Sequence, residues 1–261
     1  MTINRREFGL VSVGLAVSGG AALAKPPTIA LLVPAYFYPA GEGRKTWDRM
    51  IASATQAPIV AIANPDSGPG VKRDPNYTEV LDRALKGGVT LIGYVSTRYG
   101  QRTVGQARAD MDRWLALYPQ IRGFFLDEQS SDVGKLNHYA ALGKHARRVA
   151  PKGRLVANPG TICDERYIAE RTSDVFCLFE NRQGFDVFQP PPWAAKYPSD
   201  RFAVIPYAIE GEAAMRVALK KAVGHRIGSV FVTDAMGANP YDRLPRYWEP
   251  EVRAIATVNG N

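Results

Sequence analysis

Short, nearly continuous hydrophobic runs recur along the chain. Each run has the length of a β-strand, and successive runs start roughly 20 to 35 residues apart, which leaves room for one helix and two loops between them. The runs occupy residues 28–33, 58–63, 89–95, 123–126, 155–157, 175–179, 202–205 and 229–232. We interpret them as eight strands.

The segments between the runs have the periodicity of amphipathic helices. The clearest is 103–118, in which Val104, Ala107, Met111 and Trp114 fall on one face and charged side chains fall elsewhere. Further helices are expected at 77–85, 133–149, 212–223 and 247–258, with shorter ones at 164–171 and 193–197. Strands and helices therefore alternate along the chain.

This alternation predicts a parallel sheet covered by helices. Strands that are hydrophobic throughout must be buried on both faces, which is typical of parallel sheets. With eight strand–helix units, the first choice is a single-domain α/β fold, the (β/α)8 TIM barrel. A doubly wound open sheet is the alternative, but no GxGxxG motif follows the first run, and residues 33–36 do not form a phosphate-binding turn.

The first 24 residues have the features of an export signal. Arg5 and Arg6 precede a moderately apolar stretch, 9–23, that three glycines interrupt, and small residues at 22 and 24 suit a signal peptidase. The stretch is shorter than the ~20 residues of a membrane-spanning helix, so we expect no stable membrane anchor. We predict that the twin-arginine export machinery delivers a mature barrel, residues 25–261, to the periplasm or the medium.

Charge and soft-ligand content exclude several other functions. The net charge is +8, but no basic run is longer than two residues, so nucleic-acid binding is not expected. The histidines, His138, His145 and His225, and the cysteines, Cys163 and Cys177, lack metal-ligand spacing. We therefore expect no metal and no cofactor.

Carboxylates and tyrosines follow the hydrophobic runs. In a (β/α)8 barrel, the carboxyl ends of the strands meet at one mouth, where catalytic residues lie. Asp127 and Glu128 end the fourth run and Glu180 ends the sixth, so we predict that these three are catalytic. Aromatic, amide and acidic groups suit sugar binding. The residues predicted to bind a polysaccharide substrate are Tyr36, Tyr38, Asn64, Tyr94, Tyr207 and Asp234.

The expected chemistry is acid/base cleavage of a glycosidic bond. We assign Glu180 as general acid, Asp127 as nucleophile or charge stabiliser, and Glu128 as a neighbour that tunes them. Strands four and six are separated by one strand, about 9 to 10 Å of backbone, so a retaining and an inverting geometry both stay open. Strand alternation should send Asp127 and Glu128 to opposite faces, so only one can point straight at the sugar.

Other readings of the same residues are weaker. The acidic pair could cap the next helix, although Ser131 or Asp132 could do so instead. Cys163 could be a nucleophile, but no histidine stands at another strand end to activate it. A cation site built from Asp127, Glu128, Glu180 and Asp234 is conceivable, since hard metals take oxygen ligands.

Several of these segments resemble the spherulin-4-like, or spherulation-specific, family, which overlaps glycoside hydrolase family 135. The resemblance rests on LLVPAYFYP (31–39), NPDSGPG (64–70), GYVSTRYG (93–100), FFLDE (124–128), NPG (158–160) and NPY (239–241). It implies a (β/α)8 barrel with endo-acting cleavage of α-1,4-linked N-acetylgalactosamine in galactosamine-containing exopolysaccharide. The family's acidic pair falls on Asp127 and Glu128 and its later glutamate on Glu180, whereas Asp66 replaces the expected asparagine.

Two functional hypotheses follow. In the first, the protein is an exported polysaccharide hydrolase. In the second, it is a non-catalytic envelope protein whose barrel mouth binds glycans. The presence of all three carboxylates favours the hydrolase, because a binding protein has no need for a general acid.

Overall fold

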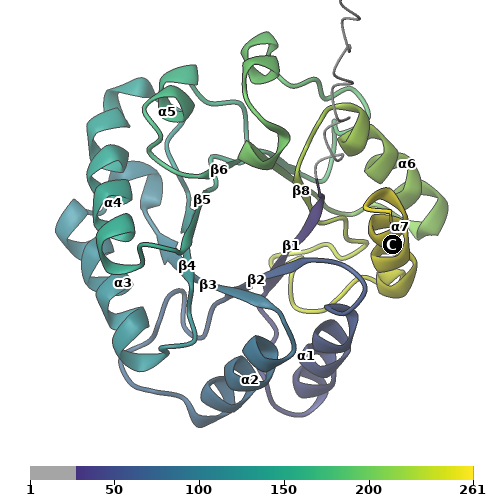
Figure 1. The fold of residues 1–261 in the computed structure, drawn as a ribbon, viewed down its shortest axis with the longest axis horizontal. Coiled ribbons are helices and arrows are strands. Elements are labelled where there is room, and N and C mark those ends of the chain that lie inside the picture. Colours follow the sequence, from purple (N-terminus) through teal and green to yellow (C-terminus); the bar gives the residue numbers. More distant parts are fainter. Residues whose placement is uncertain (1–27, 261) are drawn as a thin grey trace, which may run out of the picture.

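The computed structural model describes residues 28–260 and shows a closed barrel of parallel strands surrounded by helices (Figure 1). The strands pair in chain order around the barrel. They are β1 (Ala30–Ala35), β2 (Ile59–Ala63), β3 (Thr90–Ser96), β4 (Gly123–Asp127), β5 (Arg154–Ala157), β6 (Val175–Asn181), β7 (Phe202–Pro206) and β8 (Ser229–Val230). The prediction of a single (β/α)8 barrel is confirmed, and each predicted run overlaps one strand.

The barrel closes through its shortest strand. β8 pairs with β1 at Ala30–Ser229 and Leu31–Val230, and with β7 on its other side. The strands are buried along almost their whole length, as their continuous hydrophobic sequences require.

The helices form the outer layer (Figure 1). They are α1 (Glu42–Ser53), α2 (Pro75–Lys86), α3 (Val104–Leu117), α4 (Leu136–Val149), α5 (Glu165–Ala169), α6 (Gly211–Gly224) and α7 (Trp248–Val258). Short 3-10 segments are η1 (Arg98–Gly100), η2 (Val133–Lys135), η3 (Pro192–Lys196) and η4 (Ser199–Arg201). The predicted helix at 193–197 is thus a 3-10 turn.

One helix, α1, was not predicted from the sequence pattern. Its buried side chains are only Trp47, Met50 and Ser53, and its first turn is polar. Most of the other residues of α1 are polar, so its few apolar residues stand in a hydrophilic segment. The structure shows that Trp47 anchors it, with its ring fully buried against Phe37 and its Nε1 donating to the Phe37 carbonyl at 3.0 Å.

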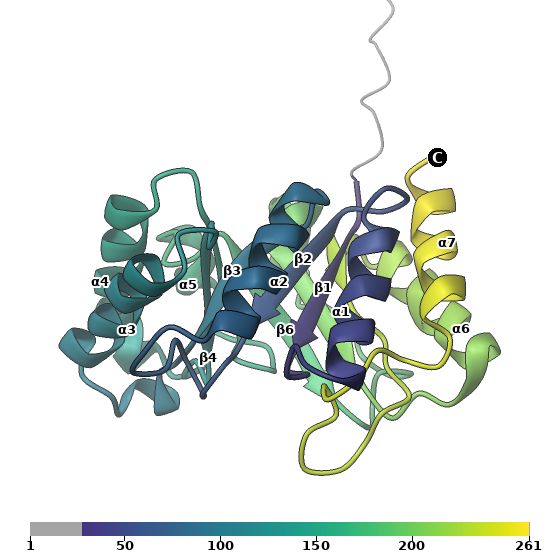
Figure 2. The ribbon, with the colours of Figure 1, turned by 90° about the horizontal axis from the view of Figure 1, so that it is seen from below.

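The carboxyl ends of the strands and the loops that follow them lie on one face of the barrel, toward the bottom of Figure 2. The long connection from β8 to α7 is the most prominent loop on this face (Figure 2). The predicted export signal, 1–24, lies outside the described residues and stays a prediction. Within residues 28–260, no helix is long and apolar enough to cross a membrane.

A close approach between helix and strand fixes β3 near this face. A Cβ on Gly93 would lie 2.6 Å from the Trp114 ring of α3, so only glycine lets the indole reach the strand. Trp114 Nε1 then donates to the Tyr94 carbonyl at 2.7 Å. The backbone of Tyr94, one of the predicted sugar-binding residues, is thereby held by the α3 side of the barrel wall.

Candidate active site

One asparagine joins the carboxylates of strands β4 and β6. Asn158 follows β5, the strand between them, and its Nδ2 donates to Asp127 Oδ1 at 2.8 Å and to Glu180 Oε2 at 2.5 Å. Asn158 is buried, whereas both carboxylates are partly exposed at the barrel mouth. The structure therefore brings together two of the three predicted catalytic residues.

The local backbone explains how these carboxylates come to face each other. Asp127 is the last residue of β4, and the following 3-10 turn η2 is capped by Asp132, which accepts from Gly134 N at 2.9 Å. Asp127 is thus not used as a cap. In β6 the register against β7 shifts between Cys177 and Phe179, and this irregularity resets side-chain alternation ahead of Glu180.

Glu128 departs from the strand geometry. Its φ of 54° is left-handed, which ends the strand alternation expected for the pair at 127 and 128. Its Oε2 accepts a 2.5 Å hydrogen bond from Ser96 Oγ at the end of β3. The expectation that one of the two carboxylates holds a neighbour fits Glu128, which is tied to Ser96 and stands beside the Asp127–Asn158–Glu180 cluster.

Tyrosines surround the two bridged carboxylates. The Tyr241 hydroxyl donates to Glu180 Oε1, and Tyr94 lies close enough to Asp127 to influence the pKa of its carboxyl group. Tyr36 lies between these two tyrosines, with edge-on contacts to Tyr94 at 5.8 Å and to Tyr241 at 5.6 Å between ring centroids. The predicted sugar-binding residues Tyr36 and Tyr94 therefore stand next to the candidate catalytic groups.

Both bridged carboxyl groups favour the protonated form more than usual. Burial raises the pKa of Asp127, and hydrogen bonds from Tyr94 and Asn158 oppose the rise. Burial also raises the pKa of Glu180, the charge of Asp127 raises it further, and hydrogen bonds from Tyr241 and Asn158 oppose these effects. A carboxyl group with a raised pKa can retain a proton for general acid catalysis.

Three other predicted sugar-binding residues lie farther from this cluster or are held by local contacts. Tyr38 is 49% exposed, and its hydroxyl donates to Asp74 at 2.9 Å. The Asn64 side chain accepts from Gly68 N at 2.9 Å and so shapes its own loop. Tyr207 is half-buried and contacts the Tyr241 ring edge-on at 6.3 Å. Their roles in sugar binding stay predictions.

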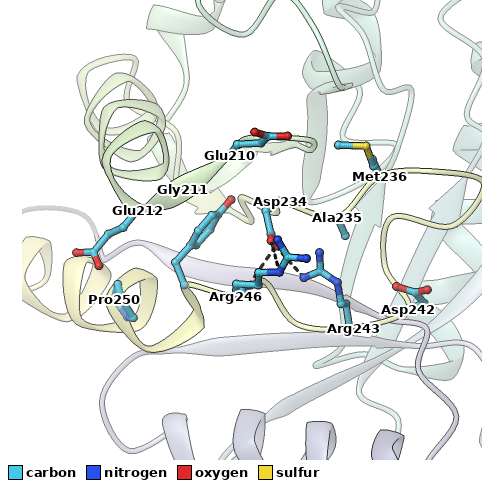
Figure 3. Close-up of a pocket in the computed structure, with 11 residues that line it drawn as sticks. Glu210, Gly211, Glu212, Asp234, Ala235, Met236, Asp242, Arg243, Arg246 and Pro250 are labelled. Atoms are coloured by element: carbon cyan, nitrogen blue, oxygen red, sulfur yellow. Dashed lines mark hydrogen bonds and ion pairs between the residues drawn. The ribbon is translucent and has the colours of Figure 1, made fainter.

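Asp234, the remaining predicted binding residue, belongs to an ion-pair cluster in a separate cavity of about 710 Å³ (Figure 3). Its Oδ1 accepts from Arg243 at 2.8 Å and from the Arg246 backbone N at 3.1 Å. Burial would raise the pKa of Asp234, but the Arg243 hydrogen bond and charge outweigh it and lower the pKa. Glu210 lines the same cavity and is exposed.

The alternative chemistries find little support in residues 28–260. Cys163 and Cys177 are buried free thiols, and burial raises the pKa of Cys163 to about 12, which disfavours the thiolate needed for attack. No group of three or more His, Cys, Asp and Glu side chains in the described part of the chain is arranged to hold a metal ion.

Asn158 and Tyr241 were missing from the predicted site residues. Both had a signal in the sequence, because Asn158 directly follows the fifth hydrophobic run and Tyr241 lies in the NPY segment that supported the family resemblance. What the sequence could not show is that each donates a hydrogen bond to Glu180. Asn158 lies 22 positions from Glu180 in the chain, and Tyr241 lies 61 positions from it.

The (β/α)8 barrel with carboxylates at its mouth is a glycosidase-type fold, and the comparisons with known proteins support this class. The chain belongs to the spherulation-specific family 4, whose model matches residues 30–255. Spherulin-4 of Physarum polycephalum is 31% identical over 242 residues, which span 88% of this chain and 71% of that protein.

Solved structures show the same barrel. Sph3 of Aspergillus clavatus, solved in complex with GalNAc, superposes with a TM-score of 0.73 at 26% identity, covering 88% of this chain and 98% of that one. Two further structures share the fold. An α-L-fucosidase from Paenibacillus thiaminolyticus superposes with a TM-score of 0.59 at 11% identity, covering 89% of this chain and 49% of that one. A chitinase domain from Pyrococcus furiosus superposes with a TM-score of 0.56 at 10% identity, covering 90% of this chain and 97% of that one.

Proposed function

We propose that this protein is an endo-acting glycoside hydrolase that cleaves α-1,4-linked N-acetylgalactosamine in galactosamine-containing exopolysaccharide. The observation that carries the proposal is the Asn158 bridge, which holds Asp127 and Glu180 together at the barrel mouth. Glycosidic bond cleavage needs one carboxylic acid for the leaving oxygen and one carboxylate for the anomeric carbon. The two bridged groups supply such a pair.

The spacing of the pair favours retention of anomeric configuration. Because one nitrogen bonds both carboxylates, at 2.8 and 2.5 Å, the bridged oxygens lie at most about 5.3 Å apart, which is below the range of inverting enzymes. Retaining enzymes separate their carboxyl groups by about 5 to 5.5 Å, whereas inverting enzymes need about 6.5 to 9.5 Å to admit a water. In our proposal, one carboxylate attacks the anomeric carbon and the other protonates the leaving oxygen.

We assign Glu180 as the acid and Asp127 as the nucleophile. The charge of Asp127 raises the pKa of Glu180, so Glu180 holds its proton while Asp127 is ionised. When Asp127 forms the glycosyl ester, that charge disappears and the pKa of Glu180 falls. Glu180, which has already given its proton to the leaving oxygen, therefore stays ionised and acts as the base for the attacking water in the second step.

The substrate assignment rests on family membership and on the likeness to Sph3, which was crystallised with GalNAc. In an α-linked N-acetylgalactosamine residue, the acetamido group and the leaving oxygen lie on the same face of the ring. The acetamido oxygen therefore cannot attack from the opposite face, and retention requires a nucleophile from the protein. The pair of Asp127 and Glu180 meets this requirement.

The test is to incubate the protein with α-1,4-linked N-acetylgalactosamine polymer and, in parallel, with other exopolysaccharides. We expect new reducing ends from the first polymer, with oligosaccharides as early products because cleavage is internal. Proton NMR of the first product should show the α anomer. Release of the β anomer would contradict retention. Binding without any new reducing ends would instead support the non-catalytic glycan-binding protein.

A further inference from the structure

A second cavity adjoins the carboxylate cluster on the β3 side of the mouth. Its volume is about 410 Å³, and Tyr94 and Glu128 form part of its wall. Tyr94 also lies beside Asp127, and Glu128 directly follows Asp127 in the chain, so the cavity borders the proposed cleavage site. Arg98, Arg102 and Asp110 also line the cavity.

The charges in this cavity balance. Arg102 pairs with Asp110 at 2.7 Å and donates to the Ser96 carbonyl at 2.8 Å, so its guanidinium is already engaged. Arg98 is exposed and forms no ion pair or side-chain hydrogen bond within residues 28–260. Glu128 has one oxygen held by Ser96 and the other without a partner in the described chain. The cavity therefore offers one free donor group and one free acceptor and has no net charge.

The backbone around the cavity is strained in a way that favours a functional role. Arg98 and Tyr99 have φ of 45° and 53°, and Glu128 and Ser67, which also line or flank the cavity, have φ of 54° and 46°. Residues with a Cβ lose about 1 to 2 kcal/mol in this left-handed region, and such strain gathers at ligand sites. Glycine or asparagine would fit these turns at lower cost.

Hydrogen bonds from buried groups hold the strained turn in place. Thr97 Oγ1 donates to the carbonyl oxygens of Asp127 or Glu128, at 2.9 and 2.8 Å, and meets the Tyr139 hydroxyl at 2.8 Å. Tyr99 N donates to the Glu128 carbonyl at 2.7 Å. These bonds link the η1 turn to the end of β4 and fix Arg98 beside Glu128.

We propose that this cavity is a second sugar subsite, in which the Arg98 guanidinium and the free Glu128 oxygen bind a neutral pyranose unit of the substrate. The proposal rests on the proposed glycosidase function. Arg98 would donate to a ring substituent oxygen, such as an acetamido carbonyl, and Glu128 would accept from a hydroxyl. A neutral sugar satisfies both groups, whereas a uronate or an ammonium-bearing sugar would be attracted by one of them and repelled by the other, with no net gain from its charge.

The experiment compares Arg98→Ala with the unaltered chain for binding of α-1,4-linked N-acetylgalactosamine oligomers of increasing length. Both carry Glu180→Gln so that the oligomers stay intact. We expect a step in affinity as the oligomer becomes long enough to fill the cavity. Arg98→Ala should remove that step, with a loss of about tenfold on the longer oligomers and little change on the shorter ones.

Three controls separate side-chain chemistry from folding. Arg98→Gly removes the guanidinium and also relieves the left-handed strain, so it should lose the same step while its melting temperature stays equal or rises. Arg253→Ala removes an exposed arginine on the outer helix α7 and should leave the step unchanged. De-N-acetylated oligomers should bind the unaltered chain more weakly than acetylated ones, and Arg98→Ala should narrow this difference.

The subsite is overturned if Arg98→Ala keeps the affinity step or if the Glu180→Gln parent shows none at any length. These outcomes are distinct from failure of the proposed function, which is read from the chain with Glu180 intact. Cleavage by that chain together with an unchanged step in Arg98→Ala rejects the subsite alone. A step that depends on Arg98 without any cleavage supports the subsite and rejects hydrolysis.

Discussion

The bridged pair Asp127 and Glu180 and the single carboxylate Asp234 have opposite electrostatic surroundings. Asp127 and Glu180 are bridged by a neutral amide and surrounded by tyrosines, and the pKa of each is raised by burial. Asp234 is bonded to Arg243 and lies near Arg246, and its pKa is lowered. Neutral donors thus orient a carboxyl group while letting it keep a proton, whereas a guanidinium fixes it as an anion.

The largest expected effect comes from neutralising the bridged pair. Asp127→Asn and Glu180→Gln should each lower the rate of hydrolysis by about 100-fold or more, because general acid and nucleophile roles contribute at least that much. Their melting temperatures should stay equal or rise, since each variant replaces a carboxyl group that burial makes costly to ionise with a neutral amide that keeps an oxygen for Asn158. Reducing-end assays and thermal unfolding provide the two measurements.

For Asp234 the comparison predicts a small effect on the rate of hydrolysis and a larger effect on stability. Asp234→Asn should keep the rate within a few-fold of the parent on the same substrate. If instead Asp127→Asn or Glu180→Gln hydrolyses a confirmed substrate at close to the parent rate, that residue is not catalytic. Glu210, at the start of α6, is then the next candidate for replacement.

The second prediction concerns stability. Asp234→Ala should lower the free energy of unfolding by about 2 kcal/mol, because it leaves the Arg243 side chain and the Arg246 backbone N without their acceptor. The Asp234 side chain is only 6% exposed, so water replaces these bonds poorly. Urea unfolding gives the measurement.

A matched control for this loss is Glu249→Ala, which breaks the ion pair with Arg49. Glu249 is 47% exposed, and a surface pair of this kind contributes less than about 1 kcal/mol. An equal cost for the two variants would mean that the Asp234 cluster is only a surface ion pair and not a support for the β8–α7 connection.

The fold was predictable from the sequence because its signal is carried by long, simple patterns. Runs such as 89–95 and 202–205 are hydrophobic along most or all of their length, and they match β3 and β7 closely. Helix α3, with Thr103 as its N-cap, was also found. Helix α1 was missed because most of its residues are polar. Its large buried residues are Trp47 and Met50, and Trp47 meets its partner Phe37 only after folding.

The site was predictable only as far as strand ends could be read. Asp127 and Glu180 were found because each directly follows a hydrophobic run. Their separation was open, since it depends on Asn158 and on the irregularity in β6, and neither the bridging bond nor the register shift has a local sequence signature. The left-handed φ of Glu128 was equally hidden, because that conformation is imposed by bonds to Thr97 and Tyr99.

The third prediction concerns the pH dependence of the rate of hydrolysis, and its expected effect is smaller. It tests how a neutral hydrogen-bond donor influences the pKa of Glu180. The Tyr241 hydroxyl lowers the pKa of Glu180 by hydrogen bonding its ionised form. Tyr241→Phe should therefore raise the pKa of Glu180, and the alkaline limb of the pH–rate profile should move to higher pH if Glu180 is the acid. Tyr207→Phe is the matched control, since Tyr207 contacts the Tyr241 ring but donates no hydrogen bond to Glu180 within residues 28–260. An alkaline limb that stays in place, or moves to lower pH, would argue against this role.

The smallest effect is the pH dependence of stability, which should have opposite signs for the two groups. The pKa of Glu180 is higher in the folded chain than in the unfolded one, so its contribution to stability declines as pH rises from the ordinary glutamate pKa through the raised value. The pKa of Asp234 is lower in the folded chain, so its contribution is present above the ordinary aspartate pKa and declines as pH falls through the lowered value.

Melting temperatures of the parent, Glu180→Gln and Asp234→Asn between about pH 3 and pH 8 test both signs. Each variant is compared with the parent at the same pH, so Glu251, whose pKa burial also raises, contributes equally to both chains. Asp127 interacts with Glu180, so its own titration is part of the Glu180→Gln difference. Glu180→Gln should gain on the parent as pH rises, and the deficit of Asp234→Asn should shrink as pH falls. If both differences change in the same direction with pH, the two carboxylates do not have opposite surroundings.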